Sequence, residues 1–257
     1  IDLQELNHTL NCAPHAKAPG PSGIANEMLQ NLNTNSKLAL LHIFNACFKL
    51  ETLPTLWLKA NIWPIPKKQT YNHDLNYTRP ITLIEHARKI FTKIITQRLS
   101  TILLKYNILS PNNNVALPYT STLDPILTIS HILEDSNTNH KPYWILAQDM
   151  SKAYDTVHIP LLVLALKRIC IPQSIINLMT SIFTQRQNQV ITDHGLTVPY
   201  NVQDGIDQGE TISPILWRIY YDPLISRVSK QITGYTIQTN SPKGEIICTR
   251  NISFQPS

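Results

Sequence analysis

The sequence lacks several features that would assign it at once to a class of protein. Only 15% of its 257 residues are charged, against about 25% in an average protein, which excludes a highly charged disordered tail. Proline outnumbers glycine, 18 to 7, but glycine does not recur at every third position, so the chain is not collagen. No apolar run approaches the roughly 20 residues that cross a membrane, and no secretory signal follows Ile1. A globular protein with a core of ordinary size remains, since 42% of the residues are hydrophobic.

Cysteine pairs in metal-binding spacing are also missing. The four cysteines stand at positions 12, 47, 170 and 248, and none forms a Cys-x-x-Cys motif. The spacing therefore indicates neither a zinc site nor a disulfide framework. We expect free thiols and an intracellular protein, without a distinction between nucleus and cytoplasm.

Positive charge is concentrated in one part of the chain. The net charge is +5, and residues 59–105 contain nine Lys or Arg against Asp74 and Glu85, so this stretch carries +7 and the remainder −2. A local basic field suits a phosphate-bearing partner. A solvated helix face explains the same pattern, and charge alone slightly favours that simpler explanation.

Hydrophobic periodicity predicts an α+β protein rather than a regular parallel βαβ array. We predict helices over residues 88–105, 160–170 and 173–184, and another that begins near Ser213-Pro214. Residues 61–66 contain two prolines and read as an edge strand, and 143–147 read as a buried strand. A hairpin is expected where 189–192 and 196–202 flank Asp193-His194-Gly195.

An aspartate stands at the exit of the predicted buried strand. Asp149 opens the sequence Asp-Met-Ser-Lys-Ala-Tyr-Asp-Thr-Val, and a carboxylate in such a place is costly unless it is paired or bound to a metal. Its hard oxygen ligands suit Mg²⁺. Taken alone, such an Asp is more often a strand-end cap or turn residue.

Two further polar segments carry possible phosphate contacts. Residues 205–214 (Gly-Ile-Asp-Gln-Gly-Glu-Thr-Ile-Ser-Pro) form a glycine-flanked turn before a helix, which can approach phosphate or sugar closely. Residues 63–68 and 77–83 place cations on a proline-stiffened backbone, where Arg offers a fork and Lys a point charge. Glycine-rich turns are common, and solubilising charge on an edge strand is the simpler explanation of the cations.

Four segments together, in this order, resemble the reverse transcriptase domain of non-LTR (LINE-like) retrotransposons. Lys-Ala-Pro-Gly-Pro-Ser-Gly-Ile (17–24) resembles the start of the family's fingers, and Tyr-Thr-Arg-Pro-Ile-Thr-Leu (77–83), followed by a Lys-Ile helix, resembles its fingers strands. Residues 149–157 resemble palm motif A, and residues 205–214 resemble motif B. The resemblance covers about residues 14–228 and implies a right-hand polymerase fold with fingers and a partial palm, built on an antiparallel sheet with packed helices.

The resemblance implies RNA-templated extension of a DNA primer with dNTPs, using two Mg²⁺ ions, or Mn²⁺ in their place. Asp149 would be the catalytic metal ligand, with the Met150 backbone carbonyl as a second contact, and Asp155 would be structural. The other implied contacts are Lys67, Arg79, Tyr154, Gln208 and Gly209 for the nucleotide, and Arg88, Lys89, Lys93 and Arg98 for nucleic acid. The Tyr154 ring would exclude a 2′-hydroxyl. A membrane is not among the expected partners, whereas an endonuclease domain can accompany this one in a full-length element.

The sequence departs from the family pattern at several points. Asp207 and Glu210 stand where basic and small residues are more usual, and they would repel phosphate unless they face away. Residues 116–122 match their segment only loosely. The aromatic-x-Asp-Asp motif is missing, because the sequence contains no Asp-Asp pair, and after Glu210 its only carboxylates are Asp222 and Glu245.

These departures lead to an expected division and two functional alternatives. We predict fingers and fingers–palm helices over residues 1–140, palm over 141–230, and a truncated palm segment over 231–257, without a thumb. The leading interpretation is a reverse transcriptase fragment that is inactive by itself. The alternative is a non-catalytic nucleic-acid-binding remnant of a decayed retroelement, and an unrelated α+β protein is a distant third.

Overall fold

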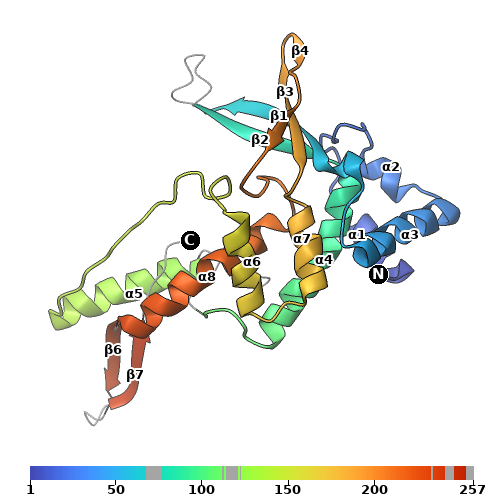
Figure 1. Ribbon diagram of the computed structural model, residues 1–257. Coiled ribbons are helices and arrows are strands. Elements are labelled where there is room, and N and C mark those ends of the chain that lie inside the picture. Colours follow the sequence, from blue (N-terminus) through green and yellow to red (C-terminus); the bar gives the residue numbers. More distant parts are fainter. Residues whose placement is uncertain are drawn as a thin grey trace.

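The computed structural model (Figure 1) describes residues 1–67, 77–111, 113, 121, 123–232, 234–240 and 246–252. The loosely matching loop at 116–122 falls almost entirely outside these ranges, as does Glu245. Within them the chain is α+β, as predicted.

Helices are the commonest elements of the described chain, and their ends follow from local signals. The predicted helix at 88–105 is confirmed as α4, His86–Lys105. Pro160 and Pro214 lie in the first turns of α6 (Ile159–Arg168) and α8 (Ser213–Gln231), where a missing N–H removes no helical bond. The other α-helices are α1 (Leu3–Asn11), α2 (Asn26–Gln30), α3 (Thr34–Leu50), α5 (Leu123–Asn139) and α7 (Gln173–Ser181), and a short 3-10 helix, η1, covers Thr55–Leu58.

A five-stranded sheet stands beside these helices (Figure 1). Its strands are β1 (Lys59–Pro66), β2 (Thr78–Ile84), β3 (Arg186–Thr192), β4 (Gly195–Leu196) and β5 (Tyr200–Val202). The order is β2-β1-β3-β4, with β5 also paired to β3. The expected antiparallel sheet is in fact mixed, because β1 pairs antiparallel with β2 but parallel with β3. The predicted hairpin is confirmed, since Thr192 pairs with Gly195 across the turn.

The predicted edge strand at 61–66 is only half at an edge. Residues Lys59 to Ile62 of β1 pair with β3 on one side, and the whole strand pairs with β2 on the other. Pro64 and Pro66 lie beyond the part that pairs with β3. Among the described residues, the prolines thus occupy the half of β1 that pairs on one side only, where a missing N–H is tolerated.

The predicted buried strand at 143–147 is wrong. Residues 141–150 run as an extended connection between α5 and α6 (Figure 1), and no described strand pairs with them. The side chains are solvent-exposed, with Trp144 98% and Leu146 88% accessible. An apolar run forms a buried strand only when neighbouring strands satisfy its backbone N–H and C=O groups, and the described residues offer none there.

A second sheet, of two strands, forms the C-terminal part of the described chain. It consists of β6 (Tyr235–Asn240) and β7 (Ile246–Ile252), paired antiparallel. The Tyr235 hydroxyl donates a hydrogen bond of 2.7 Å to Asp135 Oδ2 of α5. This contact attaches the hairpin to the helix that precedes the extended connection.

One hydrophobic core contains residues from every described helix except α5. It includes Phe44 of α3 and Phe91 of α4, whose ring centroids are 5.2 Å apart, and the Trp57 ring packs edge-on against Phe44. Phe91 therefore anchors the first half of α4 in this core. Across the described ranges, no helix is long and apolar enough to span a membrane.

Candidate active site

The motif A segment (residues 149–157) and the motif B segment (residues 205–214) are joined directly by their backbones. The Gly205 N–H donates to the Val157 carbonyl at 2.9 Å, and the Ile206 N–H donates to the Tyr154 carbonyl at 2.9 Å. Gly205 has φ +83°, and a Cβ there would lie 2.8 Å from the Asp155 carbonyl oxygen. Only glycine permits both this backbone conformation and this close approach. Segments about fifty residues apart thus form one rigid junction.

Motif B also touches the strand that carries the predicted triphosphate-binding arginine. Gly209 has φ +115°, and a Cβ there would lie 3.2 Å from the carbonyl oxygen of Thr82 in β2. Between the junction and this contact, Gln208 is exposed, whereas Asp207 and Glu210 on either side are buried. The loop therefore presents one polar side chain and turns two carboxylates inward.

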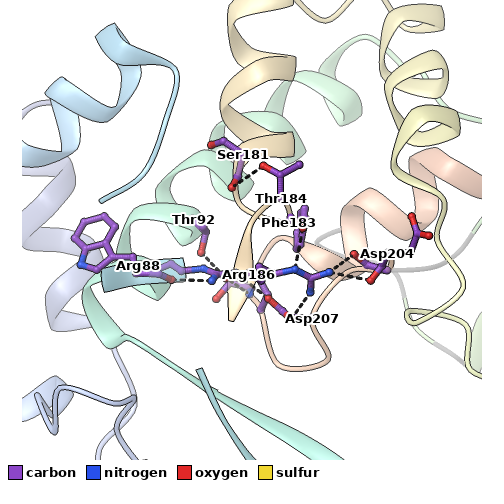
Figure 2. A network of polar contacts seen from close by, with 12 residues as sticks. Arg88, Thr92, Ser181, Phe183, Thr184, Arg186, Asp204 and Asp207 are labelled. Atoms are coloured by element: carbon purple, nitrogen blue, oxygen red, sulfur yellow. Dashed lines mark hydrogen bonds and ion pairs between the residues drawn. The ribbon is translucent and has the colours of Figure 1, made fainter. Parts of the chain in front are cut away.

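The inward carboxylates meet a fully buried arginine from the first turn of α4. Arg88 Nε donates to Glu210 Oε2 at 2.6 Å, and Nη2 donates to Asp207 Oδ2 at 2.9 Å. Its third nitrogen, Nη1, donates to the Trp57 carbonyl at 2.9 Å. Figure 2 shows the Arg88 side chain reaching from α4 towards the motif B loop.

A second buried arginine approaches the same loop from β3. Arg186 forms an ion pair with the other oxygen of Asp207, and its Nη2 donates to the carbonyls of Asp204 at 2.9 Å and Gly205 at 2.8 Å (Figure 2). The expected conflict between Asp207, Glu210 and a phosphate is therefore resolved, because both carboxylates face away from solvent and are neutralised by arginines.

The first predicted motif, residues 17–24, docks at the start of α4. The Ser22 N–H and hydroxyl donate to the two carboxylate oxygens of Glu85, at 2.7 and 2.5 Å. A Cβ on Gly20 would lie 2.5 Å from the Glu85 nitrogen, so a glycine is required for this approach. All four recognised segments thus meet around the β2–α4 corner and the motif B loop.

Tyr154 is half-buried at the motif junction. Its ring packs edge-on against Trp217 of α8, with centroids 6.2 Å apart. Burial raises the pKa of the Tyr154 hydroxyl above its ordinary value. The ring is therefore neutral and held from one side by an aromatic neighbour.

The predicted triphosphate contacts lie on the β1–β2 hairpin. Lys67 and Arg79 are both exposed. The Lys67 N–H donates to the Tyr77 carbonyl at 2.9 Å, and Arg79 pairs across the strands with Ile65. The two cations therefore stand near the same end of the hairpin.

Asp149 and Met150 lie at the exposed end of the extended connection, immediately before the turn that carries Tyr154. Two Mg²⁺ ions need several anionic oxygen ligands. In the ranges that the structure describes, no group of three or more His, Cys, Asp or Glu side chains is arranged to hold a metal. Among the described residues, Asp149 therefore belongs to no such group.

One member of the predicted nucleic-acid surface must be corrected. Arg88 is completely buried and engaged with Asp207 and Glu210, so it is not a surface contact for a phosphate. The sequence placed it on a basic helix face, but 119 residues separate it from Asp207, and local periodicity does not report such a pair.

The other three predicted nucleic-acid contacts on α4, Lys89, Lys93 and Arg98, remain predictions. Lys89 is half-buried, and burial lowers the pKa of its amine, with Glu210 acting in the opposite direction. Lys93 Nζ donates to the Cys12 carbonyl at 3.1 Å, and Arg98 forms an exposed pair with Glu5. Each is accessible in part, unlike Arg88.

Sequence reasoning missed Arg186, Thr92 and the structural role of Gly205. Thr92 Oγ1 donates to Glu210 Oε1 at 2.6 Å, so it belongs to the same cluster. The available signal was the pair of acidic residues in motif B, since buried carboxylates require cationic or hydroxyl partners. Their position did not indicate which partners.

Comparison with known proteins now decides the family. The sequence model described as "Reverse transcriptase (RNA-dependent DNA polymerase)" matches residues 65–248, which is more than half of the chain. The chain belongs to the reverse transcriptase family. Its relatives show that this reverse transcriptase domain is of the non-LTR retrotransposon type, which confirms the resemblance read from the four motifs.

Three relatives illustrate the similarity. The "Transposon TX1 uncharacterized 149 kDa protein" of Xenopus laevis is 24% identical over 93% of the chain. The "Probable RNA-directed DNA polymerase from transposon BS" and the "RNA-directed DNA polymerase from mobile element jockey", both of Drosophila melanogaster, are each 24% identical over 86% of the chain. The reverse transcriptase domain described here spans 18% of the first relative and 24% of each of the other two.

Proposed function

We propose that the chain forms the fingers and part of the palm of an RNA-directed DNA polymerase that extends a DNA primer on an RNA template. The observation that carries this proposal is the backbone junction between motif A and motif B, with hydrogen bonds from Gly205 to Val157 and from Ile206 to Tyr154. It brings the segments with Asp149, Tyr154 and Gln208 into one unit. The exposed Lys67 directly follows β1, and the exposed Arg79 lies on its partner β2, which contacts this unit through Thr82 and Gly209.

The proposed roles follow from exposure and chemistry. Asp149, with the Met150 carbonyl, is the metal contact that the chain offers, and the neutral Tyr154 ring is the platform for the incoming sugar. Gln208 and Gly209 face the nucleotide, because their loop turns its two carboxylates inward. Lys67 and Arg79 hold the triphosphate by charge-assisted hydrogen bonds.

We further propose that these 257 residues do not polymerise by themselves. Asp149 has no partner carboxylates in a metal-holding group among the described residues, and the sequence contains no Asp-Asp pair. The same observation favours the second candidate function, a nucleic-acid-binding remnant. Both candidates predict binding of an RNA–DNA duplex, and only the first predicts that a longer protein synthesises DNA.

The experiment has two arms. The purified chain is incubated with an RNA template, a DNA primer, dNTPs and Mg²⁺, and no extension is expected, although the duplex is bound with an affinity that falls as salt rises. A protein that continues the chain through an aromatic-x-Asp-Asp hairpin is expected to extend the primer. Extension by the chain alone, abolished by Asp149→Ala, would contradict the proposed inactivity. Absence of duplex binding at low salt would contradict both candidates.

A further inference from the structure

We infer that Arg88 and Arg186 are positioning residues, which hold the Gln208–Gly209 loop in its nucleotide-facing conformation through Asp207 and Glu210. This inference rests on the proposed function, in which the exposed Gln208 contacts the nucleotide. It concerns residues that do not touch the nucleotide themselves. Their proposed action is on the loop alone.

The loop is tethered on both sides of Gln208. Asp207 bridges two elements, since one carboxylate oxygen accepts from Arg88 of α4 and the other is paired with Arg186 of β3. Glu210 is held by α4 through both oxygens, one accepting from Arg88 and the other from Thr92. Figure 2 shows both arginines together with Asp207 at the loop. Gln208 therefore lies between two fixed points.

The cluster of Arg88, Arg186, Asp207 and Glu210 has equal numbers of positive and negative charges and is buried from solvent. Two guanidinium groups face two carboxylates, and none of the four side chains is more than 4% exposed. In such surroundings the loss of one charge leaves another unpaired, which is strongly destabilising. A balanced replacement by neutral groups can be tolerated energetically, yet it removes the directional bonds. The cluster's contribution to geometry can thus be separated from its contribution to stability.

Hydrogen exchange of the loop amides provides the test in the full 257-residue chain. The amides of Gly205, Ile206 and Glu210 donate to backbone carbonyls, and that of Thr211 donates to the Glu210 carboxylate, so all four report the loop's order. The main variant is Arg88→Met combined with Glu210→Gln, which leaves Arg186 and Asp207 as a balanced pair. We expect this double variant to melt at a higher temperature than either single variant. Its loop amides should nevertheless exchange at least about tenfold faster than in the parent chain, as expected for the loss of charged hydrogen bonds.

Two other variants keep the result interpretable. Thr92→Val removes one hydroxyl donor without changing charge, and it should also accelerate exchange of the loop amides if the double variant fails to fold. Arg168→Met is the matched control, because Arg168 pairs with the buried Asp222 on α8, away from the loop. Arg168→Met should lower the melting temperature. The ratio between the exchange protection of the loop amides and that of the α8 amides should remain the same as in the parent chain.

The inference is overturned if the folded double variant, or Thr92→Val, leaves the protection of the loop amides unchanged. It is equally overturned if Arg168→Met releases the loop as much as they do, since the effect would then be general destabilisation. Exchange requires no substrate. A failure of primer extension therefore bears on the proposed function, whereas these exchange rates bear on the positioning role.

Discussion

Replacing Gly205 with alanine should break the junction between motif A and motif B. The substitution introduces a Cβ 2.8 Å from the Asp155 carbonyl oxygen and 2.9 Å from the Asp155 Cα, and these backbone atoms cannot rotate away. The residue also has φ +83°, a conformation that costs an alanine about 1–2 kcal/mol. The turn at 154–157 must then move, and the two hydrogen bonds of the junction lengthen or break.

The magnitude can be isolated with a matched glycine. Gly23 has φ +74°, but nothing lies within 4 Å of a Cβ built there, so Gly23→Ala carries the conformational cost without the collision. Two lost hydrogen bonds contribute about 0.5–1.5 kcal/mol each. We therefore expect Gly205→Ala to lower the free energy of unfolding by about 1–3 kcal/mol more than Gly23→Ala.

Urea unfolding of both variants and the parent chain, followed by circular dichroism, measures the difference. Equal losses for the two alanine variants would refute the reasoning, because the close approach of the two motifs would then contribute nothing. A greater loss for Gly23→Ala would refute it as well.

Two further predictions concern titratable groups. Burial raises the pKa of the Cys47 thiol to about 11, so a thiol reagent at neutral pH should modify the exposed Cys12 and Cys170 in the native chain and Cys47 only after unfolding; equal rates for Cys47 and Cys12 would contradict this. Burial, reinforced by Lys89, lowers the pKa of His86 below its ordinary 6.5, so the unfolded chain binds the proton more readily. The uncharged His86 side chain therefore contributes its full stabilisation at pH values above 6.5. This stabilisation is lost as the pH falls below 6.5 towards the lowered pKa of His86. Between about pH 7.5 and pH 5, the parent should therefore lose more stability in urea unfolding than His86→Gln, and identical losses would contradict this.

The parts of the fold that depend on local sequence patterns could be predicted. Helix α4 follows from its apolar periodicity, and the β3–β4 turn follows from Asp193-His194-Gly195. The strand predicted at 143–147 was wrong because its burial depended on neighbours that the described residues do not supply. An apolar run does not by itself show whether a neighbouring strand is present to pair with its backbone.

The sequence allowed the segments of the candidate site to be predicted, but not the contacts between their side chains. The motifs identified which residues to examine, and the order of the motifs identified the family. Arg88 was assigned to the surface because its partners, Asp207 and Glu210, lie more than one hundred residues away in the sequence. The carboxylates that appeared to conflict with phosphate are buried and paired with Arg88 and Arg186, which no local rule could show.

The proposed role of Asp149 is tested by comparing Asp149→Ala with Asp155→Ala in a protein that contains this chain together with an aromatic-x-Asp-Asp hairpin. Both aspartates are exposed, and they lie six residues apart in the same segment, so Asp155 is a matched control for the loss of a surface carboxylate. The measured quantity is the rate of DNA synthesis on a primed RNA template in Mg²⁺. We expect Asp149→Ala to abolish synthesis in a folded protein and Asp155→Ala to retain it. Retained synthesis in Asp149→Ala would contradict the central claim, and loss of folding in that variant would make Asp149 a structural residue instead.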